Sequence, residues 1–135
     1  MARRSRAREI VLQILYVDDL NPQRDLKASD EFLCARLKND SELVEFARSL
    51  LSGVRRNRGE LDTFLSEKTE NWSLDRMAVT DRNILRLGSY EILYTETPDP
   101  VAINEAVELA KRFGSKQSAQ FVNGVLDRLL QDKGT

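Results

Sequence analysis

Apolar residues recur along the chain at intervals of three and four positions, the spacing that places side chains on one side of a helix. The first such segment runs over residues 4–19, where Ala7, Ile10 and Ile14 share one side. The same spacing predicts further helices over residues 28–37, 60–68, 80–94, 101–113 and 118–130, and a short turn over 74–77. Another predicted helix is capped by Asp40 or Ser41 and has its apolar positions over residues 43–54. We therefore expect an all-α protein of about seven helices, whose second half supplies most of the core.

Turn-forming residues are too scarce for a fold of many short strands. The chain has 3 Pro and 6 Gly, whereas a sandwich or barrel needs a turn signal after every strand. Its 135 residues are enough for one domain that buries a single core without a metal or a disulfide. The sequence therefore predicts a single domain over residues 1–135, without a long linker or an internal repeat.

Some positions within the predicted helices lead to specific expectations. Leu12 and Tyr16 fall on the polar side of the first helix, which indicates a contact surface. Gly88 lies on the apolar face of its helix and would let another helix approach closely. The segment 101–113 is apolar nearly all round, so we expect this helix at the centre of the core, with Asp99 as its N-terminal cap.

The chain is close to neutral as a whole, but its charge is unevenly distributed. It has 21 Lys and Arg against 22 Asp and Glu, a formal net charge of -1. The first eight residues contain Arg3, Arg4, Arg6 and Arg8 and no acid, so the rest of the chain has a formal charge of -5. A small basic patch on a mostly acidic domain favours a confined contact with nucleic acid over a broad electrostatic one.

Side chains that commonly carry catalysis or bind metals are scarce. The chain has no histidine and one cysteine, Cys34, which removes the commonest proton-transfer group and metal ligand and excludes an intramolecular disulfide. Cys34 is expected to be a buried small hydrophobe. No glycine-rich phosphate loop or calcium loop is present. We therefore expect no catalytic residue, no metal site, no cofactor and no enzymatic activity.

The N-terminal arginines are followed on the same helix by Gln13 and Tyr16. Arginine binds phosphate oxygens bidentately, an amide can hydrogen-bond base edges, and an exposed aromatic ring offers a plane for stacking. This combination is typical of a contact with single-stranded RNA. The alternative is a frayed, solvated basic tail, and the residues alone leave both interpretations open.

A second candidate cluster surrounds the turn after Gly114. It combines Lys116, two amides at Gln117 and Gln120, and the aromatic ring of Phe121 near the start of a helix. A helix start offers free backbone N–H groups to a phosphate, and the ring offers a stacking plane. The alternative for Phe121 is an ordinary core position.

The first 17 residues have the charged and apolar order of a signal peptide, but Gln13 interrupts the apolar run and Asp18 and Asp19 end it. No apolar stretch approaches the length of a membrane span. We expect a cytoplasmic protein without a membrane contact.

Three strings in the sequence resemble the NusB family of transcription antitermination factors. They are Arg4 to Tyr16 (RSRAREIVLQILY), Asp81 to Glu91 (DRNILRLGSYE) and Val101 to Asp127 (VAINEAVELAKRFGSKQSAQFVNGVLD). The resemblance implies a compact fold of two small helical bundles. It also implies binding of boxA-type single-stranded ribosomal RNA leader sequences together with the ribosomal protein NusE, and entry into an RNA polymerase antitermination complex that suppresses termination.

The resemblance also implies roles for individual residues. An arginine-rich N-terminus is the family's principal RNA contact, so the expected RNA-binding residues are Arg3, Arg4, Arg6, Arg8, Gln13, Tyr16, Lys116, Gln117, Gln120 and Phe121. The NusE surface in the family includes the helix that begins near Asp81, and the matching candidates are Asp81 and Arg86, expected to project from that helix. Some relatives dimerise, so a homodimer is possible.

Two other functions remain open from the sequence. A NusB-like domain also occurs in front of the catalytic domain of some ribosomal RNA cytosine methyltransferases, although these 135 residues leave no room for that catalytic domain. A helical scaffold that binds only proteins is the third possibility. Continuation of the reading frame beyond Thr135 would favour the methyltransferase module. RNA titrations with and without the partner protein would separate an RNA-binding factor from the scaffold.

Overall fold

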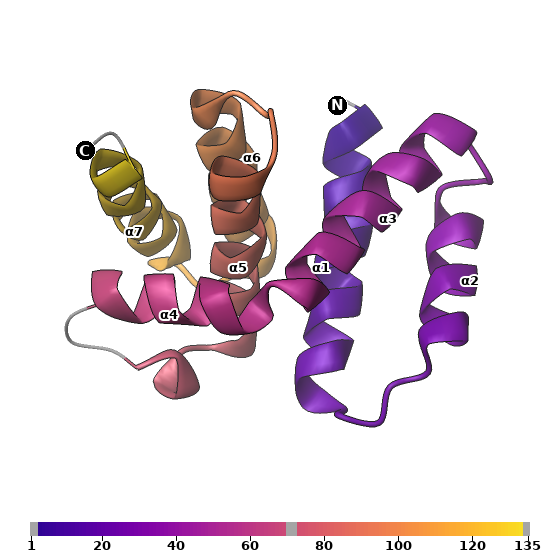
Figure 1. Ribbon diagram of the computed structural model, residues 1–135, viewed down its shortest axis with the longest axis horizontal. Coiled ribbons are helices and arrows are strands. Elements are labelled where there is room, and N and C mark those ends of the chain that lie inside the picture. The colour runs from indigo at the N-terminus through magenta and orange to yellow at the C-terminus, as the bar shows by residue number, and fades with distance from the viewer. Residues whose placement is uncertain (1–2, 70–72, 134–135) are drawn as a thin grey trace. The chain divides into compact units, whose positions relative to one another are not determined.

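The computed structural model describes residues 3–69 and 73–133, and within these ranges the chain is all-α, as the sequence predicts (Figure 1). The described residues form seven α-helices and one 3-10 turn, without a strand. The elements are α1 (Arg3–Leu20), α2 (Leu26–Arg36), α3 (Ser41–Arg56), α4 (Arg58–Lys68), η1 (Leu74–Arg76), α5 (Val79–Tyr94), α6 (Asp99–Phe113) and α7 (Ser118–Lys133). Most helix ends lie within three residues of the predicted ones.

The helices form two compact units, Met1–Gly53 and Val54–Thr135, in agreement with the expected pair of small helical bundles. The boundary falls within α3. No helix of the described residues combines the length and the apolar character that a bilayer span requires.

In the first unit, α1 is buried on more sides than its pattern predicts. Every residue from Ala7 to Leu12 is buried. The expectation that Leu12 joins Tyr16 on an exposed face was therefore wrong for Leu12, which is 4% exposed, whereas Tyr16 is 40% exposed. A simple apolar stripe underestimates the burial of a helix that is covered on several sides.

By contrast, α2 buries few of its side chains. Leu33 is the one buried residue within its bounds, and Leu37 is buried just after it. An ion pair with α3 adds a second tie, because Arg48 donates to both carboxylate oxygens of Asp30 at 2.8 Å. Cys34, which was expected to be buried, is half-buried beside this pair.

The centre of the second unit is α5 rather than α6. All residues from Asn83 to Ile92 are buried, and α5 packs against α4, α6 and α7. The expected central position of α6 was wrong, because Val101, Asn104 and Glu108 are exposed along one side of it. Asp99 is also not the N-terminal cap. It is the first residue of α6, and its carboxylate binds the Lys133 ammonium at 3.1 Å.

At Gly88, α5 packs closely against two neighbouring helices, as the sequence predicts. A Cβ at this position would lie 2.8 Å from Cδ1 of Leu126 on α7 and 3.2 Å from Cβ of Ala106 on α6. The absence of a side chain at this position therefore lets α5 approach two neighbouring helices at once.

Substituting this glycine tests the packing. We expect Gly88→Ala to destabilise the protein, because overpacking costs about 1–3 kcal/mol. Gly124→Ala is the matched control, since Gly124 is also helical but a Cβ there would meet open space. Both changes gain helix propensity, which is up to about 1 kcal/mol, so the difference between their free energies of urea unfolding isolates the clash. Equal free energies of unfolding in the two variants would contradict the packing described for Gly88.

Candidate nucleic-acid interface

The four N-terminal arginines lie on the first two turns of α1 and not in a frayed tail, because the helix begins at Arg3. We call Arg3, Arg4, Arg6 and Arg8 the arginine cluster. Arg3 and Arg4 are exposed and Arg6 is half-buried. Arg8 is 4% exposed, which differs from the expected set of four accessible side chains.

An aromatic ring on α3 organises two of these arginines. The guanidinium carbon of Arg4 lies 4.4 Å from the centroid of the Phe46 ring, and that of Arg8 lies 5.2 Å from it. A cation near an aromatic face is attracted by the ring quadrupole, by roughly 0.5–1 kcal/mol at an exposed site and more when desolvated. Phe46 therefore fixes the exposed Arg4 and the buried Arg8 to the same surface. No sequence signal marked Phe46 for this role.

The other two arginines bind acids. Arg3 donates to Asp40, and Arg6 donates to Glu9 at 3.1 Å. Asp40 also accepts a hydrogen bond from the backbone N–H of Leu43 at 3.2 Å, at the start of α3. That bond, with a further contribution from Arg3, holds the pKa of the Asp40 carboxyl below its ordinary value. The arginine cluster is thus arranged before any ligand binds.

Gln13 and Tyr16 follow one turn apart on α1. Tyr16 presents an exposed ring, and Gln13 is half-buried at the edge of a groove formed by α1, α2 and the loop between them. The groove has a volume of about 410 Å³. Its lining residues, which define the α1–α2 groove, are Gln13, Ile14, Val17, Asp18, Asn21, Arg24, Asp25, Ala28, Ser29 and Phe32.

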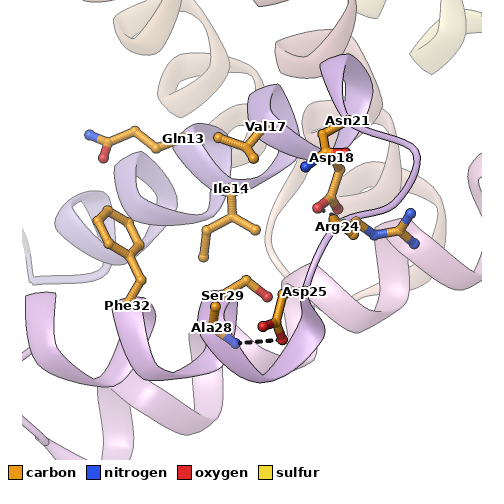
Figure 2. A pocket seen from close by; sticks show the side chains of 10 residues that line it. All are labelled: Gln13, Ile14, Val17, Asp18, Asn21, Arg24, Asp25, Ala28, Ser29 and Phe32. Atoms are coloured by element: carbon orange, nitrogen blue, oxygen red, sulfur yellow. Dashed lines mark hydrogen bonds and ion pairs between the residues drawn. The ribbon is translucent and has the colours of Figure 1, made fainter.

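Figure 2 shows Gln13 and Phe32 at one end of the α1–α2 groove and the charged residues at the other. There, Nε of Arg24 lies 3.3 Å from Oδ1 of Asp18, and Asp25 caps α2 by accepting from the N–H of Ala28 at 3.1 Å (Figure 2). The middle of the groove is apolar.

Large hydrophobic side chains are exposed around the α1–α2 groove. They are Tyr16, Val17, Leu20, Leu26 and Phe32. Such a concentration of exposed apolar surface marks an interaction site on a soluble protein. Of these side chains, only Tyr16 was predicted from the sequence to be exposed, although the weak apolar pattern of residues 20–32 indicates few buried positions.

The second predicted cluster lies in the second unit, where it forms part of a cavity of about 380 Å³. We call this cavity the α5–α7 pocket. It is lined by Arg76, Met77, Ala78, Asp81, Ser115, Gln117, Ser118 and Phe121. Of the sequence-predicted residues, it brings together Gln117, Phe121 and Asp81, whereas Lys116 and Gln120 are exposed outside its lining.

Local hydrogen bonds fix both walls of the α5–α7 pocket. Arg82 donates to the carbonyl of Leu74 at 3.2 Å, which ties η1 to α5. On the other wall, the N–H of Ser115 donates to Oγ of the buried Ser118 at 2.8 Å. Phe121 is half-buried, so its ring is neither a core side chain nor fully solvated. Sequence analysis missed Arg76, which lies five residues before Asp81 and reaches the same cavity.

The two candidate residues for a protein partner do not lie on one surface. Arg86 is 4% exposed, which contradicts the expectation that it projects from α5. Its guanidinium donates to Asp62 of α4 through Nε at 2.8 Å and Nη2 at 3.1 Å, and to Oδ1 of Asn83 at 3.0 Å. Arg86 therefore serves the packing of α4 on α5, whereas Asp81 lines the α5–α7 pocket.

Comparison with known proteins places this architecture in one family. The model of the NusB family matches residues 5–131. A transcription antitermination protein NusB of Anaeromyxobacter dehalogenans is 43% identical over 128 residues, which are 95% of this chain and 90% of the relative. The Myxococcus xanthus protein of the same name is also 43% identical, over 96% of this chain and 95% of the relative.

Solved structures agree with the sequence matches. The structure of T. maritima NusB superposes with a TM-score of 0.86 at 37% identity, over 98% of this chain and 92% of that one. A chain from a crystal structure of the antitermination factors NusB and NusE in complex with dsRNA superposes with a TM-score of 0.82 at 25% identity, over 98% of both chains.

The pair of the buried Arg86 and the half-buried Asp62 yields a prediction on stability. We expect Asp62→Ala to lower the free energy of unfolding by up to about 3–5 kcal/mol, because it removes the carboxylate that faces the buried guanidinium. Arg86→Ala should cost less on the electrostatic side, because Asp62 is 29% exposed and also lies 4.0 Å from Nε of Arg58. Since the two residues form one interaction, the double variant should lose less than the sum of the single losses. Chemical denaturation of the three variants measures the coupling, and strictly additive losses would show that the two side chains act independently.

Proposed function

This chain belongs to the NusB family, and we propose on that basis that it is an RNA-binding transcription antitermination factor that works by assembly. The observation that carries the proposal is the arginine cluster, which is held on α1 by Phe46 and Asp40. The finer parts of the proposal are a boxA-type ribosomal RNA leader as ligand, NusE as partner, and entry into an RNA polymerase antitermination complex in the cytoplasm.

The comparisons support a role without catalysis. The relatives described above are named as transcription antitermination proteins, not as enzymes, and this chain covers 90% or more of their length. The alternative of a methyltransferase module has no comparable support from these matches. The related complex that contains NusB, NusE and dsRNA supports RNA and NusE as the two partners.

The geometry refines how RNA would be bound. Arg3, Arg4 and Arg6 have accessible guanidinium groups for phosphates, whereas the buried Arg8 contributes by positioning Arg4 through their common contact with Phe46. The exposed ring of Tyr16 can stack on a base. The α5–α7 pocket adds a second recognition element in the other unit.

The α1–α2 groove is the best candidate surface for NusE. Residues 17–32 contain five acids and two bases, a formal charge of -3, and they surround exposed apolar side chains. A partner with a basic surface would complement this charge. We therefore propose that NusE binds the α1–α2 groove and not the surface around Arg86, which is buried. Self-association of the chain would compete for the same apolar surface.

The first prediction from this proposal concerns salt dependence. Three phosphate contacts to single-stranded RNA contribute a slope of about -2.1 to the plot of log affinity against log salt, at roughly -0.7 per contact. Substituting Arg3, Arg4 and Arg6 together by Gln should remove this slope, as measured by fluorescence anisotropy at several salt concentrations.

Three exposed bases elsewhere in the same unit, Lys27, Arg36 and Lys38, provide the matched control. Substituting them by Gln changes the net charge equally and should leave the slope nearly unchanged. If both triple variants lose the same slope, the arginine cluster is not the phosphate-binding site. Arg8→Gln should lower stability more than it changes the slope.

The second prediction concerns the protein partner. Val17→Asp places a charge on the α1–α2 groove, where Val17 is 54% exposed, and should weaken NusE binding at least tenfold, since a charge would be desolvated on complex formation. Val101→Asp on α6, where Val101 is 44% exposed, is the control and should bind NusE normally. Calorimetric titrations with NusE, repeated in the presence of RNA, measure both. Normal NusE binding by Val17→Asp would remove the groove from the proposal.

A further inference from the structure

Phe32 of α2 presents an exposed aromatic ring next to the side chain of Gln13 on α1. The ring is 37% exposed, and both residues line the same end of the α1–α2 groove (Figure 2). Within the described residues, the side-chain amide of Gln13 has no hydrogen-bond partner. Figure 2 shows this amide turned away from the apolar middle of the groove. An exposed ring and an unpaired amide on two facing helices can together hold a planar ligand with a polar edge.

This end of the groove continues the surface of the arginine cluster. Gln13 follows Arg6 by seven positions, so the two side chains lie on the same face of α1. They are separated by roughly 10 Å along the helix axis at about 1.5 Å per residue, a span that about three stacked nucleotides cover at roughly 3.4 Å each. The contact between Arg3 and Asp40 places the segment after α2 beside the start of α1, so α2 runs back toward the arginine cluster.

The two ends of the groove differ in charge. The guanidinium carbon of Arg36, one helical turn after Phe32, lies 5.4 Å from the centroid of the Phe32 ring. A cation at this distance is attracted to the ring and helps to hold it in place. Asp18 and Asp25 lie at the opposite end of the groove (Figure 2). A phosphodiester chain is therefore tolerated at the Phe32 end and repelled from the Asp25 end.

We propose that Phe32 stacks on one base of the single-stranded RNA that the arginine cluster holds, and that Gln13 hydrogen-bonds the edge of the same base. This inference rests on the proposed RNA-binding function and adds to it a contact on α2. Stacking tolerates every base, because each base has a π-face, so the contact adds affinity without selecting a sequence. The apolar middle of the groove, with Val17, and its acidic end remain for the protein partner.

A stacking contact and a phosphate contact respond differently to salt. Phe32 is uncharged, so a base that stacks on it releases no counterion, whereas each arginine bound to a phosphate contributes to the salt slope. Loss of the ring should therefore lower the affinity for RNA by the same factor at every salt concentration.

The test uses the full-length protein and a fluorescently labelled single-stranded RNA of the boxA type, titrated at several salt concentrations. Phe32→Ala should weaken binding roughly 5- to 150-fold, the range for the loss of one stacked base, and should keep the salt slope of the unchanged protein. Phe32→Trp retains a stacking plane and should bind within about twofold of the unchanged protein.

Tyr94→Ala is the matched control, because Tyr94 is an aromatic residue with 39% exposure at the end of α5 in the second unit. It should leave the affinity for RNA unchanged. Circular dichroism verifies that each variant is folded.

A second measurement locates the stacked base. RNAs that each lack one base, at successive positions, are titrated against the unchanged protein and against Phe32→Ala. At the stacked position, the missing base should weaken binding by the unchanged protein and have no further effect on the variant. Gln13→Ala should depend on the same position, because both side chains contact one base.

Other outcomes overturn the inference in distinguishable ways. Equal RNA binding by Phe32→Ala and the unchanged protein removes the stacking contact but leaves the proposed RNA function intact. An equal loss in Phe32→Trp, or a flattened salt slope in Phe32→Ala, shows that the ring supports the arginine cluster and does not stack on a base. Normal RNA binding with weakened NusE binding assigns Phe32 to the protein partner. If the unchanged protein binds no RNA, both the inference and the proposed function fail.

Discussion

The burial of α5 among α4, α6 and α7 is the constraint on which the second unit depends. This helix buries polar side chains along with its apolar ones, and each needs a partner inside the protein. Arg86 binds Asp62 of α4, and Glu91 accepts from the hydroxyl of Thr97 at 3.0 Å. These partners lie on different segments, so together they fix the rotation and the register of α5. The first turn of α5, with Asp81, is thereby held beside the start of α7, and the α5–α7 pocket is a consequence of the core.

In the first unit, contacts of the arginine side chains with neighbouring residues order the candidate binding surface. Long basic side chains lose rotamer entropy when they bind a phosphate, by up to about 2 kcal/mol each on common scales. Phe46 and Asp40 already restrict Arg4 and Arg3 in the unbound protein, so part of this loss would occur on folding. A chain with a net charge of -1 can thus present a basic site without a basic surface overall.

Helical periodicity was sufficient to predict the helices and the position of the arginines on α1, because these depend on residues near one another in sequence. The close packing at Gly88 was predicted from a glycine on an apolar helix face, although its neighbours Ala106 and Leu126 are distant in sequence. The errors have a common cause in long-range contacts. Arg8, Arg86 and Leu12 were assigned to exposed faces, yet each is buried by segments distant in sequence. The α5–α7 pocket is lined by residues from 76–81 and from 115–121. No local sequence pattern predicts that these two segments lie side by side. Polar residues on a helix indicate solvent only when no neighbouring helix supplies a counter-charge.

The two candidate RNA contacts differ in what they contribute, and this difference explains why both are useful to an assembly factor. Phosphate contacts from three arginines give a weak, salt-sensitive attraction that is the same for every sequence. A pocket that encloses a base adds little electrostatic attraction, but the polar groups that line it can favour one base over another. A protein with only the first contact would bind any RNA, and one with only the second would bind too weakly to retain it. Two small sites in two units, joined to a partner through a third surface, reach useful affinity through the increased local concentration that linkage provides.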